Sequence, residues 1–225
     1  MYIFAKKTNE ENNLLFTITL LFSNVLIAQK IGAEAGLNLA TMIDNDFDDD
    51  NKRFLPGFHV RGIFEMNFND YISAQAGMGL SQKGLKFKFV EDEFSYTSSM
   101  SLYYLDMPIL FKGGIPVGDG KIYGCVGPNF GLALFGMHKY KSTYNGETES
   151  DTDAIDFEDD DIARFDFGIK SIFGYETGFG LYTQFSYEFG ITDVEKHSTP
   201  PLPGTNLDKT RNSVIGISVG YLFGL

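Results

Sequence analysis

Charged side chains of both signs recur along this 225-residue chain at spacings that could support chemistry. On one face of a series of alternating segments they are Glu34, Arg61, Glu65, Lys83, Asp106, Lys112, Asp166, Lys170 and Glu188, joined by the polar residues Asn38, His59, Gln75, Asn129 and Gln184. Carboxylates beside a histidine could act as general acid and general base. A buried network of ion pairs also requires negatively and positively charged side chains in near-equal numbers. We favour the structural network over a catalytic site.

Other candidates for catalysis are sparse. Besides His59, the histidines are His138 at a strand end and His197 in a loop, and the chain has no H-E-x-x-H pattern and no glycine-rich phosphate loop. Residues 95–101 are rich in serine, but the sequence places no base beside them. The one cysteine, Cys125, cannot form an internal disulfide and fits a packed strand position. We therefore expect no enzyme activity and no cofactor, with a hydrolase or acyltransferase as an alternative.

Acidic residues concentrate in two predicted loops. These loops hold fourteen of the 30 acidic residues, namely Asp44, Asp46, Asp48, Asp49 and Asp50, then Glu147, Glu149, Asp151, Asp153, Asp156, Glu158, Asp159, Asp160 and Asp161. Clustered carboxylates could bind divalent cations, but the first cluster lacks the glycine and the closing glutamate of a calcium loop. Solvated loops are the favoured interpretation. The net charge of −12 argues against a nucleic-acid partner, which would need a basic face.

The elements that carry these residues read as strands. The chain has 22 Phe, 12 Tyr and 25 Gly but no Trp, and aromatic residues suit a pleated sheet while glycines suit tight turns. Period-two alternation predicts eight strands, at 30–42, 56–68, 71–84, 102–115, 121–137, 164–176, 179–192 and 212–224.

The predicted connections alternate in length. Short turns at 67–70, 116–120 and 177–178 alternate with long segments at 43–55, 85–101, 138–163 and 193–211. Outer-membrane barrels have this asymmetry, with short periplasmic turns at one rim and long extracellular loops at the other. The pattern predicts an all-β, eight-stranded antiparallel transmembrane up-and-down β-barrel.

The two faces of the strands indicate which side lies inside. In the segment 181–189, for example, Leu181, Phe185 and Phe189 share one face while Gln184 and Glu188 share the other. An eight-stranded interior has no room for aromatic residues from nearly every strand. We therefore predict an inside-out barrel with apolar residues facing lipid, and glycines and ion pairs filling a plugged lumen. A soluble lipocalin-like binder is the alternative with the opposite facing.

The N-terminal segment is expected to be an export signal. Lys6 and Lys7 precede an apolar run from Leu14 to Ile27, which is shorter than the roughly 20 residues of a membrane-spanning helix. Glu10, Glu11 and Leu26 fit a signal peptide less well, so a short anchor or a misassigned start remains open. We assign residues 1–28 to a signal peptide and 29–225 to the barrel domain.

Several motifs resemble an outer-membrane β-barrel family common in Bacteroidota, often labelled the PorT family or porin family. They are Gly36-Leu37-Asn38-Leu39-Ala40, Leu80-Ser81-Gln82-Lys83-Gly84, the stretch from Tyr104 to Lys112, Gly127-Pro128, Phe165-Asp166-Phe167-Gly168 and Tyr187-Glu188-Phe189-Gly190-Ile191. The junction Ala28-Gln29 also resembles the cleavage site frequent in that group, and Ser218, Gly220, Phe223 and Leu225 resemble a barrel-assembly signal.

The resemblance implies a fold and a cell outer-membrane location, but no catalytic residues. The expected partners are outer-membrane lipids, the barrel-assembly machinery and an envelope protein bound through the extracellular loops. We expect a structural or surface-interaction protein, and the alternative is a component of a PorT-like secretion or adhesion assembly.

Overall fold

The described part of the chain is built from ten strands. The computed structural model describes residues 29–43, 51–91, 94–195 and 209–224. The strands are β1 (Gln29–Ile43), β2 (Lys52–Arg53), β3 (Leu55–Asn67), β4 (Ile72–Glu91), β5 (Phe94–Val117), β6 (Gly120–Tyr144), β7 (Glu147–Ala154), β8 (Phe165–Glu176), β9 (Leu181–Gly190) and β10 (Arg211–Gly224). Among these residues, none belongs to a helix with the length and apolar character needed to cross a membrane.

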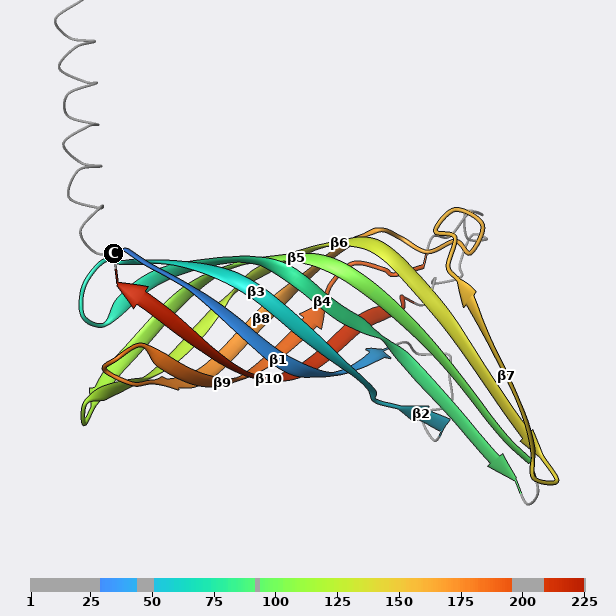
Figure 1. The fold of residues 1–225 in the computed structure, drawn as a ribbon. Coiled ribbons are helices and arrows are strands. Elements are labelled where there is room, and N and C mark those ends of the chain that lie inside the picture. The colour runs from blue at the N-terminus through green and yellow to red at the C-terminus, as the bar shows by residue number, and fades with distance from the viewer. Residues whose placement is uncertain (1–28, 44–50, 92–93, 196–208, 225) are drawn as a thin grey trace, which may run out of the picture.

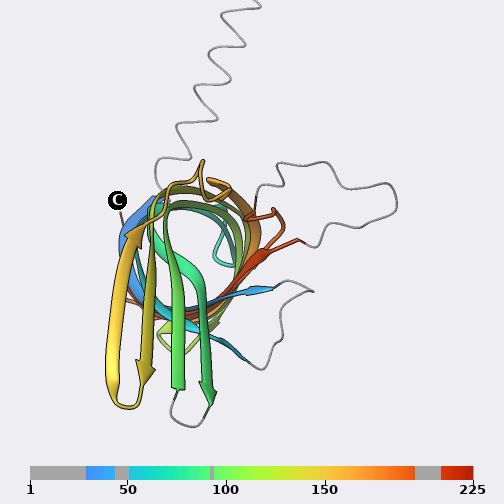
Figure 2. The same cartoon turned by 90° about the vertical axis from the view of Figure 1, so that its right-hand side faces the viewer.

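Eight of the strands close into an antiparallel ring. The order is β1, β3, β4, β5, β6, β8, β9 and β10, and β10 pairs back onto β1 (Figures 1 and 2). The two remaining strands lie outside the ring, where β2 pairs with β4 and β7 pairs with β6. Ring closure removes the open sheet edges that would otherwise expose unpaired backbone groups. The predicted eight-stranded up-and-down barrel is confirmed.

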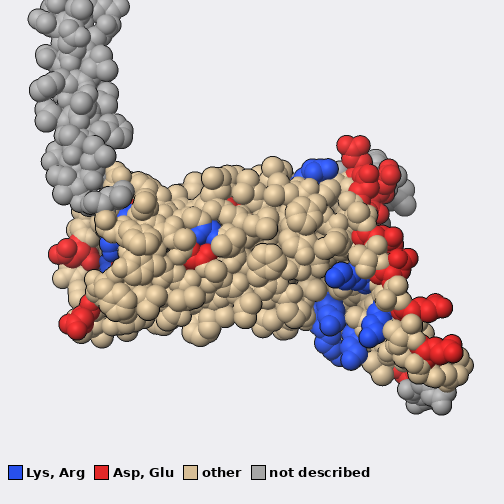
Figure 3. Space-filling model, in the orientation of Figure 1, with Lys and Arg blue, Asp and Glu red and all other residues tan. Residues whose placement is uncertain are grey.

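The outer wall of the barrel is apolar. Leu37 is 67% exposed and Phe185 is 63% exposed, and both lie on the outward face. Across the strands, Ile217 is in register with Phe185, which is in turn in register with Phe173, so outward apolar side chains form continuous bands. On the face of the barrel wall that Figure 3 shows, charged residues are almost absent. This is the surface that contact with lipid requires, and it confirms the predicted inside-out facing.

The interior also contains apolar packing, which differs from the prediction that bulky residues face outward. One buried cluster comprises Ile63, Leu110, Tyr123, Cys125, Ile172, Tyr182 and Leu222. The two tyrosines of this cluster fit the interior because each has an apolar ring and a polar hydroxyl group. Tyr123 donates a hydrogen bond to Gln184 Oε1 at 2.9 Å, and Tyr182 donates one to Glu34 Oε2 at 2.9 Å. Their rings fill space while their hydroxyls satisfy the polar groups.

Short turns and long connections separate to opposite ends of the barrel. Residues 68–71, 118–119 and 177–180 form the turns at one end, where β1 begins and β10 ends. We call this the short-turn end and the other the loop end.

Two of the predicted loops are wrong over much of their length. Residues 85–91 and 94–101 extend β4 and β5 as a paired hairpin, and 137–144 pairs with 147–154 as β6 and β7. Asn145 (φ 49°) and Gly146 (φ 85°) form the tight turn between β6 and β7. An Asn-Gly pair is a strong hairpin signal because such turns need two residues with positive φ.

Some expectations fall on residues that the structure does not describe. The signal peptide at 1–28, the aspartates at 44–50, His197 and Leu225 all lie outside the described residues.

Candidate functional site

The candidate site is the polar lumen of the barrel. The structure places all nine charged residues of the proposed network on inward faces and buries them, with exposed fractions from 0% for Glu65 to 6% for Arg61 and Lys170. They come from β1, β3, β4, β5, β8 and β9. Inward positions follow from strand alternation, because successive side chains point to opposite faces of a sheet.

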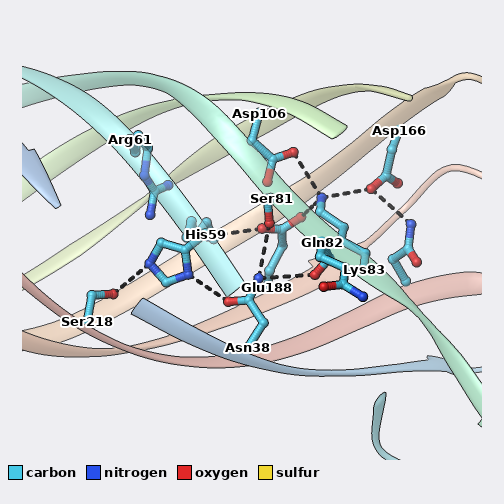
Figure 4. A network of polar contacts seen from close by, with 12 residues as sticks. Asn38, His59, Arg61, Ser81, Gln82, Lys83, Asp106, Asp166, Glu188 and Ser218 are labelled. Carbon is cyan, nitrogen blue, oxygen red and sulfur yellow. Dashed lines mark hydrogen bonds and ion pairs between the residues drawn. The ribbon is translucent and has the colours of Figure 1, made fainter. Parts of the chain in front are cut away.

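Lys83 is the centre of the charge cluster nearest the loop end. Its Nζ lies 3.1 Å from Asp106 Oδ1 and 3.0 Å from Asp166 Oδ2, and it forms an ion pair with Glu188 (Figure 4). Lys170 Nζ contacts the second oxygen of Glu188 at 3.1 Å. The Lys83 ammonium also lies 4.9 Å from the centre of the Tyr104 ring. One lysine therefore contacts three carboxylates, and the four residues come from four different strands.

A second cluster lies in the middle of the lumen around Glu34. Arg61 forms an ion pair with Glu34 through its guanidinium, and Tyr182 and Gln184 each donate a hydrogen bond to Glu34 Oε2 at 2.9 Å. Both oxygens of this buried carboxylate are thus satisfied, as burial of a charge requires.

The third cluster lies near the short-turn end around Lys112. Its Nζ is 2.7 Å from Glu65 Oε2 and 2.7 Å from Glu176 Oε2, and Lys30 Nζ reaches Glu176 Oε1 at 2.6 Å. Sequence reasoning omitted Glu176 and Lys30 from the network. The signal was present, because Glu176 shares the inward parity of Asp166 and Lys170 on β8.

A serine, a histidine and an asparagine form a hydrogen-bonded chain in the lumen. Ser218 Oγ lies 2.9 Å from His59 Nε2, and His59 Nδ1 lies 2.7 Å from Asn38 Oδ1 (Figure 4). This is the order of nucleophile, base and orienting group that acyl-transfer chemistry uses. Ser218 also stands in a G-x-S-x-G pattern at 216–220, which sequence reasoning did not identify.

The surroundings of this chain do not support catalysis. The pattern at 216–220 lies inside a barrel strand, whereas the G-x-S-x-G nucleophile of an α/β-hydrolase stands on a strand-to-helix turn. All three side chains are buried inside the barrel. Because no acyl group could reach Ser218, we interpret the chain as part of the packed lumen.

An apolar lid covers the lumen at the loop end. Ile155, Phe157 and Ile162, from the segment between β7 and β8, pack with Val194 against the barrel residues Met42, Leu102, Tyr104 and Ala133. Arg164 lies over the Phe157 ring at 4.3 Å. Beside the lid is a half-open pocket of about 410 Å³ lined in part by His138, Asp160 and Glu195. The lumen is therefore closed by charge pairs along its length and by apolar packing at its mouth.

The remaining candidate residues do not form a further site. Cys125 is buried in the apolar cluster of the interior. His138 accepts or donates a hydrogen bond with the Tyr140 hydroxyl at 3.0 Å on the β6 extension. In the described ranges, no group of three or more His, Cys, Asp or Glu residues is arranged to hold a metal ion. Of the assembly-signal residues, Ser218 and Gly220 face inward, while Phe223 is exposed on the outer wall.

The chain matches a known protein family and is similar to several solved structures. Residues 27–196 match the family model described as outer membrane protein beta-barrel domain. Solved structures similar to the chain include the attachment invasion locus protein Ail of Yersinia pestis (14% identity, 87% of this chain and 99% of that chain, TM-score 0.37). Others are Neisserial surface protein A (12%, 87% and 97%, TM-score 0.42) and OprG of Pseudomonas aeruginosa (12%, 88% and 97%, TM-score 0.46). No curated protein matches the chain in sequence.

Proposed function

The chain belongs to the outer membrane protein beta-barrel domain family and resides in the outer membrane, and we propose that it is a closed barrel that displays a structured surface outside the cell. In this proposal the lumen is a structural plug and does not conduct solutes. The short-turn end faces the periplasm and the loop end faces outward, as the asymmetry of outer-membrane barrels implies.

The filled lumen is the observation that carries this proposal. Glu65 and Lys83 are 0% and 1% exposed, so no continuous water path runs beside them. The apolar lid, which includes Phe157 and Ile162, covers the loop end. A pore requires a wider, water-filled interior than eight strands normally enclose.

The part that extends beyond the barrel supports a role in surface interaction. β4, β5, β6 and β7 continue past the rim as two paired hairpins. All eight residues of β7 are exposed, and four of them are acidic. Acidic side chains on an edge strand discourage unspecific pairing with other strands and leave a defined surface for a partner.

A secretion or adhesion assembly is the second candidate function. The motif resemblance to the PorT family of Bacteroidota supports it, with the exposed acidic β7 as the contact surface for a basic envelope protein. Catalysis on lipids is less well supported because Ser218 and His59 are enclosed. The apolar outer wall disfavours a soluble binder. Outer-membrane lipids and the barrel-assembly machinery are the general partners we propose, the latter through Ser218, Gly220, Phe223 and Leu225.

Conductance in planar lipid bilayers tests the proposed closed barrel. We expect the folded protein to insert without discrete conductance steps. A variant that truncates the Lys83 cluster (Lys83→Ala, Asp106→Ala, Asp166→Ala and Glu188→Ala) is the control that should admit ions if it still folds. Regular steps from the unchanged protein, in proportion to the amount inserted, would contradict the proposal. Proteins that co-purify with the intact chain but not with a chain lacking residues 145–154 would favour the assembly candidate.

A further inference from the structure

The strands that project from the barrel form an extension sheet. We define it as residues 52–53, 85–91, 94–101, 137–144 and 147–154, which belong to β2, β4, β5, β6 and β7. It continues the barrel wall beyond the rim and bends away from the barrel axis, as both ribbon views show (Figures 1 and 2). One of its faces therefore continues the lipid-facing wall.

The strand register assigns the side chains of the extension sheet to its two faces. Lys83 is buried in the lumen and pairs with Leu102, which is also buried. Alternation from this pair places Lys86 opposite Ser99 and Lys88 opposite Thr97 on the outward face. Arg53 joins Lys86 from β2, and Lys139 and Lys141 are in register with Ser99 and Thr97 from β6.

We call the outward side of this sheet the basic face. Its cationic residues are Arg53, Lys86, Lys88, Lys139 and Lys141, and its other polar residues are Ser95, Thr97, Ser99, Thr143, Thr148, Ser150 and Thr152. It carries no acidic residue within the described strands. The four acids of β7, from Glu147 to Asp153, fall on the opposite face with Tyr140 and Tyr96. Opposite charges are thus sorted to opposite sides of one sheet.

The four lysines of the basic face are available to an external anion. Lys88, Lys139 and Lys141 are exposed and Lys86 is partly exposed. None of the four takes part in an ion pair within the part of the chain that the structure describes. A positive cluster without internal acids attracts anions, because no nearby carboxylate offsets its field.

Aromatic residues on the outer wall indicate where the basic face lies relative to the membrane. Tyr103 stacks on Phe135 with ring centres 4.4 Å apart, and Phe58 lies 6.4 Å from Tyr103. Aromatic girdles mark the level where the apolar core of the membrane meets the headgroups. Lys139 follows Phe135 by four residues, a strand length of about 13 Å, so the cations begin on the headgroup side of that level, away from the apolar core.

The outward bend turns the basic face toward the membrane surface. In Figure 3 the Lys and Arg side chains gather at the base of the extension, on the side that looks back along the barrel wall, while Asp and Glu side chains lie on the far side. A lipid headgroup at the rim would meet the ammonium groups first and would not meet the acids of β7.

We propose that the basic face binds the phosphate groups of outer-leaflet lipids. Lysine ammonium groups bind phosphate as point charges, and serine and threonine hydroxyls add hydrogen bonds. Several lysines at a membrane surface attract anionic headgroups cumulatively. The sheet bends over the place where such headgroups lie, so a lipid reaches this face more directly than a soluble acidic protein does.

Retention of lipid A by the immobilised, folded protein tests this assignment. The probe is diphosphoryl lipid A in mixed micelles with a zwitterionic detergent, at low salt. In the test variant Lys86, Lys88, Lys139 and Lys141 become Gln, and in the matched control the same four become Arg. Each lysine near an anionic surface contributes about fivefold in affinity, so we expect retention to fall at least about tenfold in the Gln variant and to persist in the Arg control. Heat-modifiable gel migration checks that both variants are folded.

Three results would overturn the assignment. The first is equal retention by the Gln variant and the unchanged protein. The second is equal retention of dephosphorylated lipid A, which would remove phosphate as the recognised group. The third is full displacement by inorganic phosphate at the concentration of the lipid, which would indicate a site for free phosphate. Loss of an acidic envelope protein from the Gln variant, with lipid A retention unchanged, would point to a protein partner instead.

Discussion

Replacing Lys83 by methionine tests the ion-pair plug most directly. Methionine keeps most of the volume and length of the lysine side chain but removes the ammonium group. In the folded protein that group lies 3.1 Å from Asp106 and 3.0 Å from Asp166 and pairs with Glu188. The substitution therefore leaves a well-filled lumen with unpaired negative charge.

The size of the effect follows from which carboxylates lose their partner. Glu188 keeps Lys170 at 3.1 Å, and Asp166 keeps a hydrogen bond from Asn212 at 3.1 Å, but neither Asp106 nor Asp166 keeps the cation. Removing one partner of a buried ion pair costs about 3–5 kcal/mol because the remaining charge stays desolvated. With two aspartates affected, we expect a loss at the upper end of that range.

Urea-induced unfolding in phosphatidylcholine vesicles measures this loss. The chain contains no tryptophan, so far-ultraviolet circular dichroism and the heat-modifiable gel shift replace tryptophan fluorescence. Lys88→Met is the matched control, since Lys88 is exposed on the extension sheet and a surface change of this kind alters the free energy of unfolding by about 0.5 kcal/mol or less. Adding Asp106→Asn and Asp166→Asn to Lys83→Met should recover part of the stability, because both uncompensated charges are removed.

Equal unfolding free energies for Lys83→Met and Lys88→Met would refute the reasoning. That outcome would mean that the carboxylates around position 83 do not depend on the ammonium group. Failure of the Asn substitutions to recover any stability would instead assign the loss to packing around Tyr104.

Two further predictions concern the outer wall and a single acid of the plug. Phe185→Asp should reduce insertion into vesicles, because a charge on the lipid face near the midplane costs a few kcal/mol, about 2–4 for the basic residues and less for aspartate. The control Phe185→Leu should insert normally. Normal insertion of the Asp variant would show that the predicted outward facing of Phe185 is wrong. Asp106→Ala should destabilise less than Lys83→Met, by about 1–3 kcal/mol, since Lys83 keeps Asp166 and Glu188. Urea unfolding measures this difference, and an unchanged midpoint would remove Asp106 from the plug.

The sequence determined the barrel and its facing because both depend on local regularities. Alternation with period two decides which side chains share a face, and the volume of an eight-stranded interior excludes most of the aromatic residues. These two facts together predict that Phe185 points outward and that Lys83 and Glu188 point inward. The alternation on β8 also predicts that Glu176 points inward, although Glu176 was not included in the predicted network.

Only the tertiary structure decided which residues meet. Lys83 reaches Asp166 and Glu188 across distances of 83 and 105 residues in sequence, and no local pattern specifies such pairs, because they depend on strand register and tilt around the closed ring. The same holds for the contact of Ser218 with His59 and for the sorting of Lys139 and Glu149 to opposite faces of the extension sheet. The face on which a side chain lies follows from its position along one strand. The residues that it contacts depend on how all the strands are arranged around the ring.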